Sequence, residues 1–408
     1  MVSYYSFVGI DLNRYNTVIF FMKKIYMDYA ATTPVDPRVL KTMKPYFLKY
    51  YGNSMSFHSW GVKAKQALED SREKVAKLMN AKPKEVIFTG SATESNNFAL
   101  KGIAFANREK GKHLIASTIE HHCVLDSAEW LRKQGFEISY LPVDSQGFVD
   151  LNKLEDTIRK DTILVSIIHA NNEIGTVEPI EEMGKICREK GVCFHSDAAQ
   201  SFGKIPIDVK KMNVDLLTVN AHKVYGPKGV GALYVKDGIR IEPLLHGGGH
   251  EFGLRSSTVN VAGIIGFGKV AEIQKKEMKS DAKKQIKLRD KLIKEVLNIE
   301  DSHLNGHPTK RLPNNTNFWF AFIEGESLIM QLDMKGIASS TGSACSSESL
   351  EPSHVLIAIG LKPEEAHGSL RLTIGKYTKK EEVNYVLEVL PKVIKKLREI
   401  SPFKGKWE

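Results

Sequence analysis

The sequence is poor in cysteine and lacks the runs that mark zinc-binding and membrane proteins. Its 408 residues include only four cysteines, and no two of them form a CxxC pair, which argues against a zinc ribbon or a thioredoxin-like redox motif. A low cysteine count in a long chain is typical of a reducing compartment, so we expect a cytoplasmic protein. No apolar run approaches the ~20 residues that a membrane-spanning helix needs, and no membrane contact is expected.

Two common nucleotide-binding sequences are also missing. No GxGxxG opens a helix after a first strand, and no GxxxxGK[ST] is present, so dinucleotide-binding and P-loop functions have no support. His246 and His250 are four residues apart. Three glycines separate them, however, which disfavours the helix that an HxxxH metal site requires. We predict no metal ion.

Basic residues outnumber acidic ones, 58 to 48, which gives a net charge of +10. The densest basic stretch, 275–295, has apolar residues at helical spacing, and this favours a solvated helix face over a nucleic-acid surface. The basic surface suits an anionic substrate or an acidic protein partner. Residues 1–21 lack the basic start and the cleavage site of a signal peptide. We expect either a true start at Met22 or an extra N-terminal strand.

The length predicts two domains. Between residues 59 and about 236, apolar strand-like runs alternate with amphipathic helices, which is the pattern of an α/β fold with a mostly parallel sheet flanked by helices. After about residue 276, long charged helices and a few strand-like runs predict a smaller α+β C-terminal domain. The expected parts are an uncertain extension (1–21), a small-domain N-terminal segment (22–40), a large domain (41–276) and a small domain (277–408).

Polar residues follow five of the predicted strands at the point where each strand ends. In open α/β sheets, ligands bind beyond the carboxyl ends of the strands. We therefore expect these residues to meet at one edge of the sheet. They are Ser91-Ala92-Thr93, Glu120-His121-His122, Asn171-Asn172-Glu173, Asp197 with Gln200, and His222-Lys223.

Three of these groups together predict a cofactor. The turn 90–93 offers free N–H groups at a helix start, which suits a phosphate, although an ordinary helix cap by Ser91 or Thr93 explains it too. Lys223 closes an apolar run, and a lysine near low-dielectric surroundings loses its proton more readily and attacks aldehydes. Asp197 could hold a protonated pyridine nitrogen. These are the requirements of pyridoxal 5′-phosphate.

A series of motifs spans nearly the whole chain: DYAATTPVDPRV, YGNSMSFHSWG, GSATESNNFALKG, EHHCVLD, HANNEIGTVEPI, HSDAAQSFGKIPID, AHKVYGPKGVGALYV, GGGHEFGLRSST, TGSACSS and GSLRLTIG. In this order they resemble the cysteine desulfurases of the NifS/IscS type, class-V aminotransferase-like enzymes of pyridoxal-phosphate fold type I. The resemblance implies conversion of L-cysteine to L-alanine. The sulfur would pass to an enzyme cysteine as a persulfide, for iron–sulfur cluster assembly or tRNA thiolation.

The resemblance also implies roles for individual residues around the cofactor. Lys223 would bind the cofactor covalently, and Asp197 would pair with its ring nitrogen. His121, or its neighbour His122, would stack on the ring.

Further residues would hold the substrate and the phosphate. Asn172 and Gln200 would contact the phenolic oxygen of the cofactor or the substrate. Arg371 would clamp the substrate carboxylate as a bidentate fork. One phosphate ligand would arrive from a second subunit, which implies a homodimer with shared sites. The phosphate ligands would be Ala92, Thr93, Asn220, His222 and, across the dimer, Thr258.

Cys345 lies in SSTGSACSSES, where no apolar strand or helix stripe surrounds it. The resemblance makes it the catalytic cysteine that attacks the substrate sulfur, on the longer loop of the iron–sulfur-cluster members. An iron–sulfur scaffold or another sulfur-acceptor protein would be the partner, with cluster contact at Cys345 during transfer, and no nucleic acid is expected. Cys123, Cys187 and Cys193 lie in apolar contexts and are expected to be inert core residues.

Three positions depart from the family pattern. Asn220 stands where serine is usual, Phe252 where arginine is common, and Ser257 where the glycine of RSGT is usual. They affect the expected dimer edge and substrate entrance. The alternatives within enzymes are a selenocysteine lyase, another pyridoxal-phosphate lyase, or a desulfurase-like enzyme acting on an aminoacyl-tRNA. A non-catalytic sulfur carrier or scaffold is an alternative of a different class.

Overall fold

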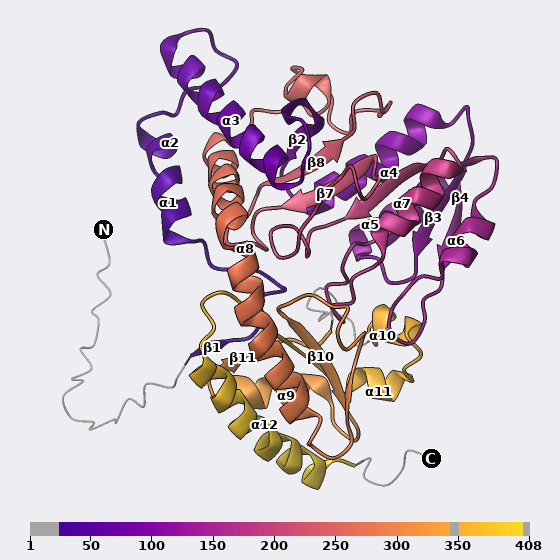
Figure 1. The fold of residues 1–408 in the computed structure, drawn as a ribbon, viewed down its shortest axis with the longest axis vertical. Helices are drawn as coiled ribbons and strands as arrows, with labels where there is room; N and C mark the ends of the chain where they lie inside the picture. Colours follow the sequence, from indigo (N-terminus) through magenta and orange to yellow (C-terminus); the bar gives the residue numbers. More distant parts are fainter. Residues whose placement is uncertain (1–23, 343–350, 403–408) are drawn as a thin grey trace, which may run out of the picture.

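A computed structural model describes residues 24–342 and 351–402 of the chain (Figure 1). The N-terminal extension 1–21 and Cys345 therefore lie outside the described residues. Within these ranges a large unit built on a seven-stranded sheet lies above a smaller α+β unit. No helix of the described ranges is both long and apolar enough to cross a membrane.

The large sheet has the strand order β2-β8-β7-β6-β5-β3-β4. Strand β8 runs antiparallel to β7 and β2, and the other described pairs are parallel. The mostly parallel sheet expected from the sequence is confirmed. The strands are β2 (Val86–Thr89), β3 (His113–Ser117), β4 (Glu137–Leu141), β5 (Thr162–Ser166), β6 (Cys193–Asp197), β7 (Leu216–Asn220) and β8 (Gly231–Val235).

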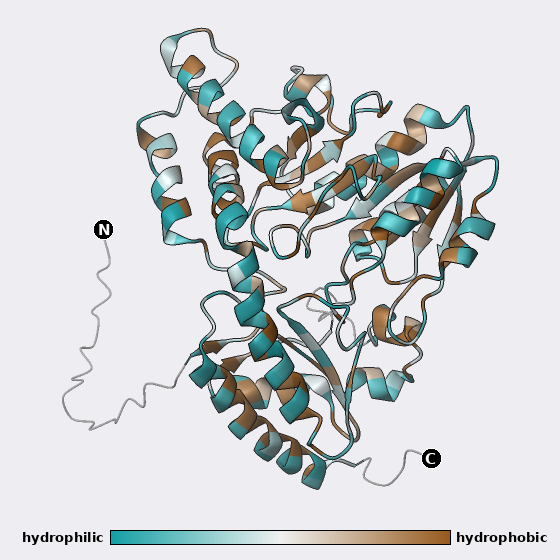
Figure 2. Cartoon of the chain, in the orientation of Figure 1, coloured by the Kyte–Doolittle hydropathy of each residue, from teal (hydrophilic) through white to brown (hydrophobic). Residues whose placement is uncertain are grey.

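Helices cover both faces of this sheet, which is why strands such as β5 and β7 are buried along their whole length and read as continuous apolar runs. One face packs against α1 (Pro37–Met43), α3 (Ser59–Leu78), α6 (Leu151–Thr157), α7 (Ile180–Glu189) and the first half of α8 (Val261–Val296). The other face packs against α4 (Ala92–Asn107) and α5 (His122–Lys133). Figure 2 shows hydrophilic and hydrophobic residues alternating along these helices, as expected for helices packed on one side.

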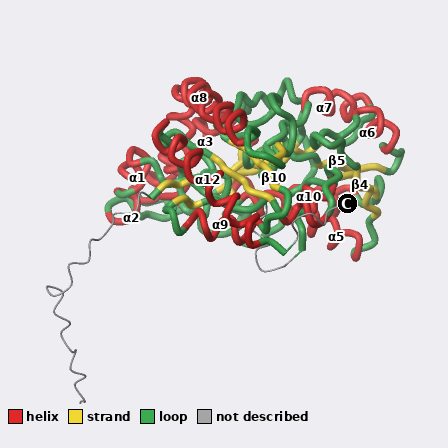
Figure 3. Tube along the Cα trace, turned by 90° about the horizontal axis from the view of Figure 1, so that it is seen from below, coloured by secondary structure: helices red, strands yellow, loops and turns green. Residues whose placement is uncertain are grey.

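The small unit contains two short sheets. Strand β1 (Ile25–Tyr26) pairs in parallel with β11 (Ile337–Ala338), and a second sheet has the order β12-β10-β9. Seen from this end of the molecule, α9 and α12 lie near β10, while α6 and α7 lie at the far edge of the large sheet (Figure 3). The elements are β9 (Ser302–Leu304), β10 (Asn315–Phe320), α9 (Gly325–Asp333), α10 (His354–Ala358), α11 (Pro363–His367), β12 (Ser369–Thr373) and α12 (Lys380–Ile400).

Helix α8 belongs to both units. Its side chains from Ile264 to Ile273 pack in the core of the large sheet, whereas Leu288, Leu292 and Val296 pack in the core of the small unit. The boundary predicted at 276/277 falls inside this one helix, between the two sets. A separate apolar cluster, from Ile119 to Ala366, packs α10 and α11 against loops at the carboxyl edge of the large sheet. The two units therefore meet where the predicted site residues gather.

Two of the departures from the family pattern lie on one loop beside a buried ion pair. Arg72 of α3 donates to Glu251 at 2.7 Å, and both side chains are almost fully buried. The Phe252 ring lies 4.9 Å from the Arg72 guanidinium carbon and covers it. Ser257 has a φ of 127°, in the region that favours glycine. The loop contains η3 (Glu251–Gly253); the remaining short helices are α2 (Pro45–Leu48) and η2 (Pro83–Glu85).

We predict that Arg72→Met lowers the free energy of unfolding by about 3–5 kcal/mol, because it leaves the Glu251 carboxylate buried without its cation. Chemical denaturation measures this change. The matched control is Arg132→Met, which breaks the half-exposed pair with Glu129 and should cost at most about 1 kcal/mol. Equal losses in the two variants would contradict the assignment of Arg72–Glu251 as a buried structural pair.

Candidate active site

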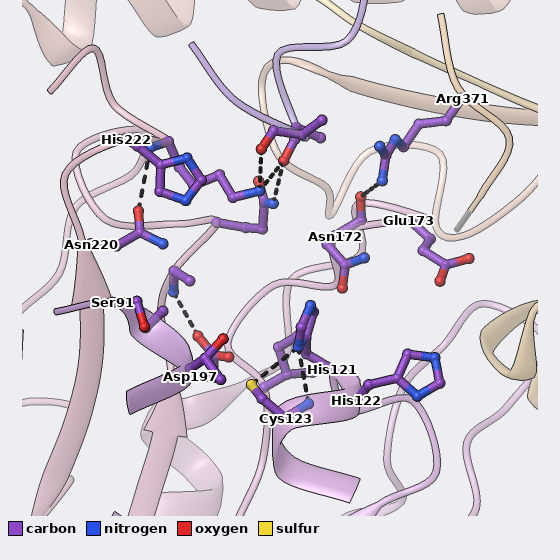
Figure 4. A pocket seen from close by; sticks show the side chains of 18 of the residues that line it. Ser91, His121, His122, Cys123, Asn172, Glu173, Asp197, Asn220, His222 and Arg371 are labelled. Atoms are coloured by element: carbon purple, nitrogen blue, oxygen red, sulfur yellow. Dashed lines mark hydrogen bonds between the residues drawn. The ribbon is translucent and has the colours of Figure 1, made fainter. Parts of the chain in front are cut away.

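A cavity of about 330 Å³ lies at the carboxyl edge of the large sheet, where the small unit meets it. Figure 4 shows its side chains converging from separate loops. The structure brings together there all the site residues expected from the sequence except Cys345 and Thr258. Those present are Ala92, Thr93, His121, Asn172, Asp197, Gln200, Asn220, His222, Lys223 and Arg371.

Cys345 and Thr258 are absent from the lining of the cavity for different reasons. Cys345 lies outside the described residues. Thr258 is exposed on the loop between η3 and α8 and does not line the cavity of its own chain.

Lys223 follows β7 and its ammonium is held by backbone oxygens. Its Nζ donates to the carbonyls of Ala30 at 2.6 Å and Ala31 at 2.7 Å, in the segment that follows β1. Gln200 Nε2 donates to the same Ala30 carbonyl at 2.9 Å. The N-terminal segment of the chain therefore forms one wall of the cavity and fixes the lysine in it.

Lys204 is hydrogen-bonded to Gln200, and the sequence analysis did not predict a role for it. Its Nζ donates to Gln200 Oε1 at 3.0 Å. Burial, followed by repulsion from Lys223 and Arg371, lowers the pKa of Lys204 to about 7. The residue lies inside the quoted motif HSDAAQSFGKIPID, but lysine is usually a surface residue, so only its half-buried position and its bond to Gln200 reveal a role.

Asp197, at the end of β6, accepts a hydrogen bond at each of its two carboxylate oxygens. Oδ1 accepts from the backbone N–H of Ala199 at 2.8 Å, and Oδ2 accepts from Asn96 Nδ2 at 2.7 Å. Asn96 lies in α4 and is completely buried. The sequence analysis also missed this residue, since an asparagine inside a helix has no signal of its own.

His121 is the N-cap of α5, and its ring nitrogen Nδ1 accepts the backbone N–H of Cys123 at 3.2 Å. A backbone N–H can only donate, so Nδ1 carries no proton and the neutral ring holds its proton on Nε2. Burial is the main cause that lowers the pKa of His121, which keeps the ring neutral at pH 7. In Figure 4 His121 lies among Asp197, Cys123 and Asn172, whereas His122 lies to one side.

Cys123 corrects part of one expectation: it packs against the apolar core as expected, but it is only half-buried and also lines the cavity. Its Sγ lies 3.1 Å from Asn96 Nδ2 and 3.1 Å from His121 Nδ1. Burial, reinforced by Asp197, raises the pKa of the Cys123 thiol to about 12, so it remains protonated and a poor nucleophile. Cys187 is buried and Cys193 half-buried, away from this cavity.

The start of α4 has the form expected of a phosphate cup. Ser91 Oγ caps the helix by accepting from the Glu94 N–H at 3.1 Å, which decides between the two predicted caps. The N–H groups of Ala92 and Thr93 have no acceptor within the helix, because the first N–H groups of any helix lack one. Burial, with Lys223 next in effect, lowers the pKa of His222 to about 4, so its ring is neutral.

Arg371, in β12, is buried, and both of its terminal nitrogens donate hydrogen bonds to protein oxygens. Nη2 donates to Asp28 at 3.0 Å, and Nη1 donates to the carbonyls of Asn172 and Gly342 at 3.1 and 3.2 Å. Its Nε finds no partner within the described ranges. A substrate carboxylate at Arg371 must therefore share the guanidinium with Asp28.

Both flanks of the segment that contains Cys345 contact residues at the cavity. Gly342 is the last described residue before it, and its carbonyl accepts from Arg371. On the other side, Ser353 Oγ donates to Glu173 at 2.5 Å. His354 Nε2 lies 2.9 Å from the Glu120 carbonyl oxygen.

These groups fit pyridoxal phosphate. A cavity of this volume suits a small molecule, and it presents a lysine amine, an oriented carboxylate, a neutral imidazole and the N-terminus of α4, a 16-residue helix. Within the described part of the chain, no cluster of three or more His, Cys, Asp or Glu residues could hold a metal ion. The fold and the site together define a pyridoxal-phosphate-dependent α/β enzyme.

The profile of the class-V aminotransferase family matches residues 25–386, and the chain belongs to this family. It is 54% identical over 387 residues to the cysteine desulfurase IscS of Dictyoglomus turgidum, covering 95% of this chain and 98% of that one. It is 50% identical over 389 residues to the mitochondrial cysteine desulfurase of Saccharomyces cerevisiae, covering 95% and 77%. The expected family and cofactor are confirmed.

Solved structures agree in fold. A NifS-like protein superposes with a TM-score of 0.87 at 40% identity, covering 92% of this chain and 100% of that one. SspA in complex with cysteine superposes with a TM-score of 0.78 at 39% identity, covering 87% and 100%. Both confirm the predicted fold class.

Glu120 provides a test of pH-dependent stability beneath the site. Its side chain is fully buried, accepts from Ser117 Oγ and the Ile168 N–H, and leaves Oε2 without a partner in the described structure. Burial raises its pKa from 4.5 to about 8. The folded protein therefore retains a proton that the unfolded chain loses above pH 4.5, and stability falls as pH rises from 4.5 to 8.

We predict that Glu120→Gln reduces this fall, because glutamine stays neutral at every pH. Urea denaturation of the cofactor-saturated protein at pH 5.5 and pH 8 measures it, and the difference between the two proteins should be on the order of 1–3 kcal/mol. Parallel pH profiles for the variant and the original protein would show that Glu120 is ionised in the fold.

Proposed function

We propose that the chain is a pyridoxal-phosphate-dependent cysteine desulfurase that converts L-cysteine to L-alanine and transfers the sulfur to Cys345 as a persulfide. The observation that carries this proposal is the meeting of Lys223, Asp197 and Arg371 in one cavity. A sulfur carrier or scaffold would need none of these three together. Several relatives at 50–54% identity over nearly the whole chain are named cysteine desulfurases.

The bound cofactor supplies an electron sink for the bonds of the substrate's α-carbon and its neighbour. Lys223 would hold its aldehyde carbon, and Asp197 would hold its ring nitrogen. The N–H groups of Ala92 and Thr93, with His222 and Asn220, would hold its phosphate. Gln200, fixed by Lys204, and Asn172 would contact the phenolic oxygen or the substrate. Arg371 would bind the substrate carboxylate.

The tautomer of His121 limits what it can do. Since Nδ1 already accepts the N–H of Cys123, the only ring proton that faces other partners is on Nε2. His121 would therefore act toward the cavity as a hydrogen-bond donor and not as a base, and the amine of Lys223 would be the proton acceptor.

The anchoring of its flanks supports Cys345 as the attacking thiol. Only Ser343 and Ala344 separate it from Gly342 in the sequence, and Gly342 is bonded to Arg371, the proposed carboxylate clamp. The Cys345 thiolate would attack the sulfur of the bound substrate. The S–S bond forms as the C–S bond of the substrate breaks. The electron pair of the broken C–S bond stays on the carbon atom, which is then protonated, and the product leaves as alanine.

We predict that Cys345→Ala binds the cofactor and L-cysteine but releases alanine and sulfide at least ~100-fold more slowly than the original protein, since a persulfide cannot form. The assay combines the visible spectrum with simultaneous measurement of alanine and sulfide in the presence of a reductant. Lys223→Ala should instead lose the cofactor band, and Cys187→Ala should keep full turnover.

Desulfuration at a near-original rate by Cys345→Ala would overturn the proposal. It would favour a selenocysteine lyase or another lyase that needs no protein thiol.

We also propose a homodimer with shared sites. Thr258 is exposed and does not line the cavity of its own chain, as expected of a residue that serves a second subunit. Six large apolar side chains are exposed within residues 47–60, from α2 through the following loop to the start of α3, and exposed apolar surface of this kind is typical of a protein interface. They are Phe47, Leu48, Tyr51, Met55, Phe57 and Trp60.

We predict that Thr258→Ala weakens cofactor retention, and that mixing it with Lys223→Ala subunits restores part of it. In a mixed dimer, one composite site then contains both original residues. Cofactor content after gel filtration at low cofactor concentration measures the recovery. The proposal of shared sites fails if mixed dimers, verified by two affinity tags, retain no more cofactor than the parent variants.

The sulfur acceptor would be an iron–sulfur scaffold or another carrier protein, and the basic surface, with a net charge of +10, would favour an acidic one. Cytoplasmic location is proposed on the low cysteine content alone.

A further inference from the structure

We propose that Asn96 is a positioning residue that orients Asp197 and, through Cys123, His121. The inference rests on the proposed function, because these two residues act on the cofactor only when it is bound in the cavity. It goes beyond that function by assigning a role to a residue that does not line the cavity.

The amide of Asn96 has two N–H bonds, and each points to a different residue of the site. Nδ2 lies 2.7 Å from Asp197 Oδ2 and 3.1 Å from Cys123 Sγ. The side chain is completely buried in α4, so water cannot replace either contact without a rearrangement of the helix against the sheet.

The chemistry of the neighbours fixes which way the amide faces. An asparagine oxygen beside the Asp197 carboxylate would place two acceptors 2.7 Å apart, so the nitrogen must face the carboxylate. The amide oxygen Oδ1 is then left buried without a partner among the described residues. A buried unmade hydrogen bond costs stability, about 1–3 kcal/mol. In this orientation the hydrogen bonds of both N–H groups to Asp197 and Cys123 compensate for the unpaired oxygen.

For Asp197, Asn96 is one of two donors that define the plane of the carboxylate. The Ala199 N–H holds Oδ1 at 2.8 Å, and Asn96 holds Oδ2. With only the backbone donor left, the carboxylate could rotate about its terminal bond, because this torsion is broad. An oriented carboxylate is what a protonated ring nitrogen needs in order to stay protonated.

For His121, the link runs through the sulfur of Cys123. Sγ accepts from Asn96 Nδ2 and, as a protonated thiol, donates to His121 Nδ1 at 3.1 Å. The Cys123 backbone N–H donates to the same nitrogen. Two donors on Nδ1 keep the proton of the ring on Nε2. One buried amide thus connects the carboxylate and the imidazole that flank the proposed cofactor position.

The test uses Asn96→Leu, which keeps the volume and removes the donors. The matched control is Asn97→Leu, the same change on the same helix, where the amide donates only to the Thr93 carbonyl at 3.0 Å. Two readouts are independent of turnover. They are the dissociation constant of pyridoxal phosphate from the apoprotein, and the pH midpoint of the visible absorption band of the bound cofactor.

We expect Asn96→Leu to weaken cofactor binding by at least tenfold and to move the midpoint upward by about one pH unit. The direction follows from charge: a ring nitrogen that loses its proton would no longer repel a proton on the nitrogen of Lys223, which would hold the cofactor. Asn97→Leu should change binding by less than threefold and leave the midpoint in place. Cys123→Ala, which breaks only the branch to His121, should also leave the midpoint unchanged and weaken binding by less than Asn96→Leu does.

If Asn96→Leu does not fold by circular dichroism, Asn96→Ser replaces it, with the same upward shift expected. An unchanged midpoint and affinity in a folded Asn96 variant overturn the inference, as does an equal effect of Asn97→Leu. Failure of the original protein to bind pyridoxal phosphate would overturn the proposed function itself, and the two results are thereby distinguishable.

Discussion

The arrangement of the two units around the cavity depends on which groups accept hydrogen bonds from one lysine, Lys223, at the edge of the large sheet. Lys223 lies three residues after the end of β7 and is half-buried at the cavity, and an amine in that position needs acceptors. They come from the Ala30 and Ala31 carbonyls, which lie about 190 residues earlier in the chain. The N-terminal segment must therefore cross from the small unit to the carboxyl edge of the large sheet, and in doing so it closes the cavity.

The same segment is fixed by further polar contacts on either side of these carbonyls. Asp28 pairs with Arg371 of the small unit, and Asp36 pairs with Lys376 and with Arg38. The pairs with Arg371 and Lys376 are mostly buried, whereas Arg38 is half exposed, and buried pairs of this kind contribute to geometry more than to stability. Because the Asp28–Arg371 pair joins this segment to β12, and Arg371 also holds Gly342, the cofactor lysine and the flank of the Cys345 segment are parts of one connected structure.

Three polar residues of the cavity are held in place by hydrogen bonds from neighbouring residues. Asp197 is oriented by α4, Gln200 by Lys204, and His121 by the first turn of α5. In each case the group predicted to do chemistry is placed by a residue without a recognisable motif role. A preorganised site of this kind avoids reorganisation when the ligand binds.

Much of the large sheet and of the cavity could be predicted from the sequence. Strand runs, the Ser91 cap and the polar residues at strand ends depend on neighbours a few positions apart, so periodicity and motif order were sufficient for the sheet and for most residues of the cavity. The sequence could not show that one helix, α8, serves both cores, or that Asn96 is buried and Lys204 half-buried beside the site. It also misplaced Cys123. The contact that fixes the His121 tautomer lies two residues away, but burial and the shifted pKa values depend on contacts between distant residues. Asn96 and Asp197 are 101 positions apart, and Asp28 and Arg371 are 343 positions apart, and only the tertiary structure brings such residues together.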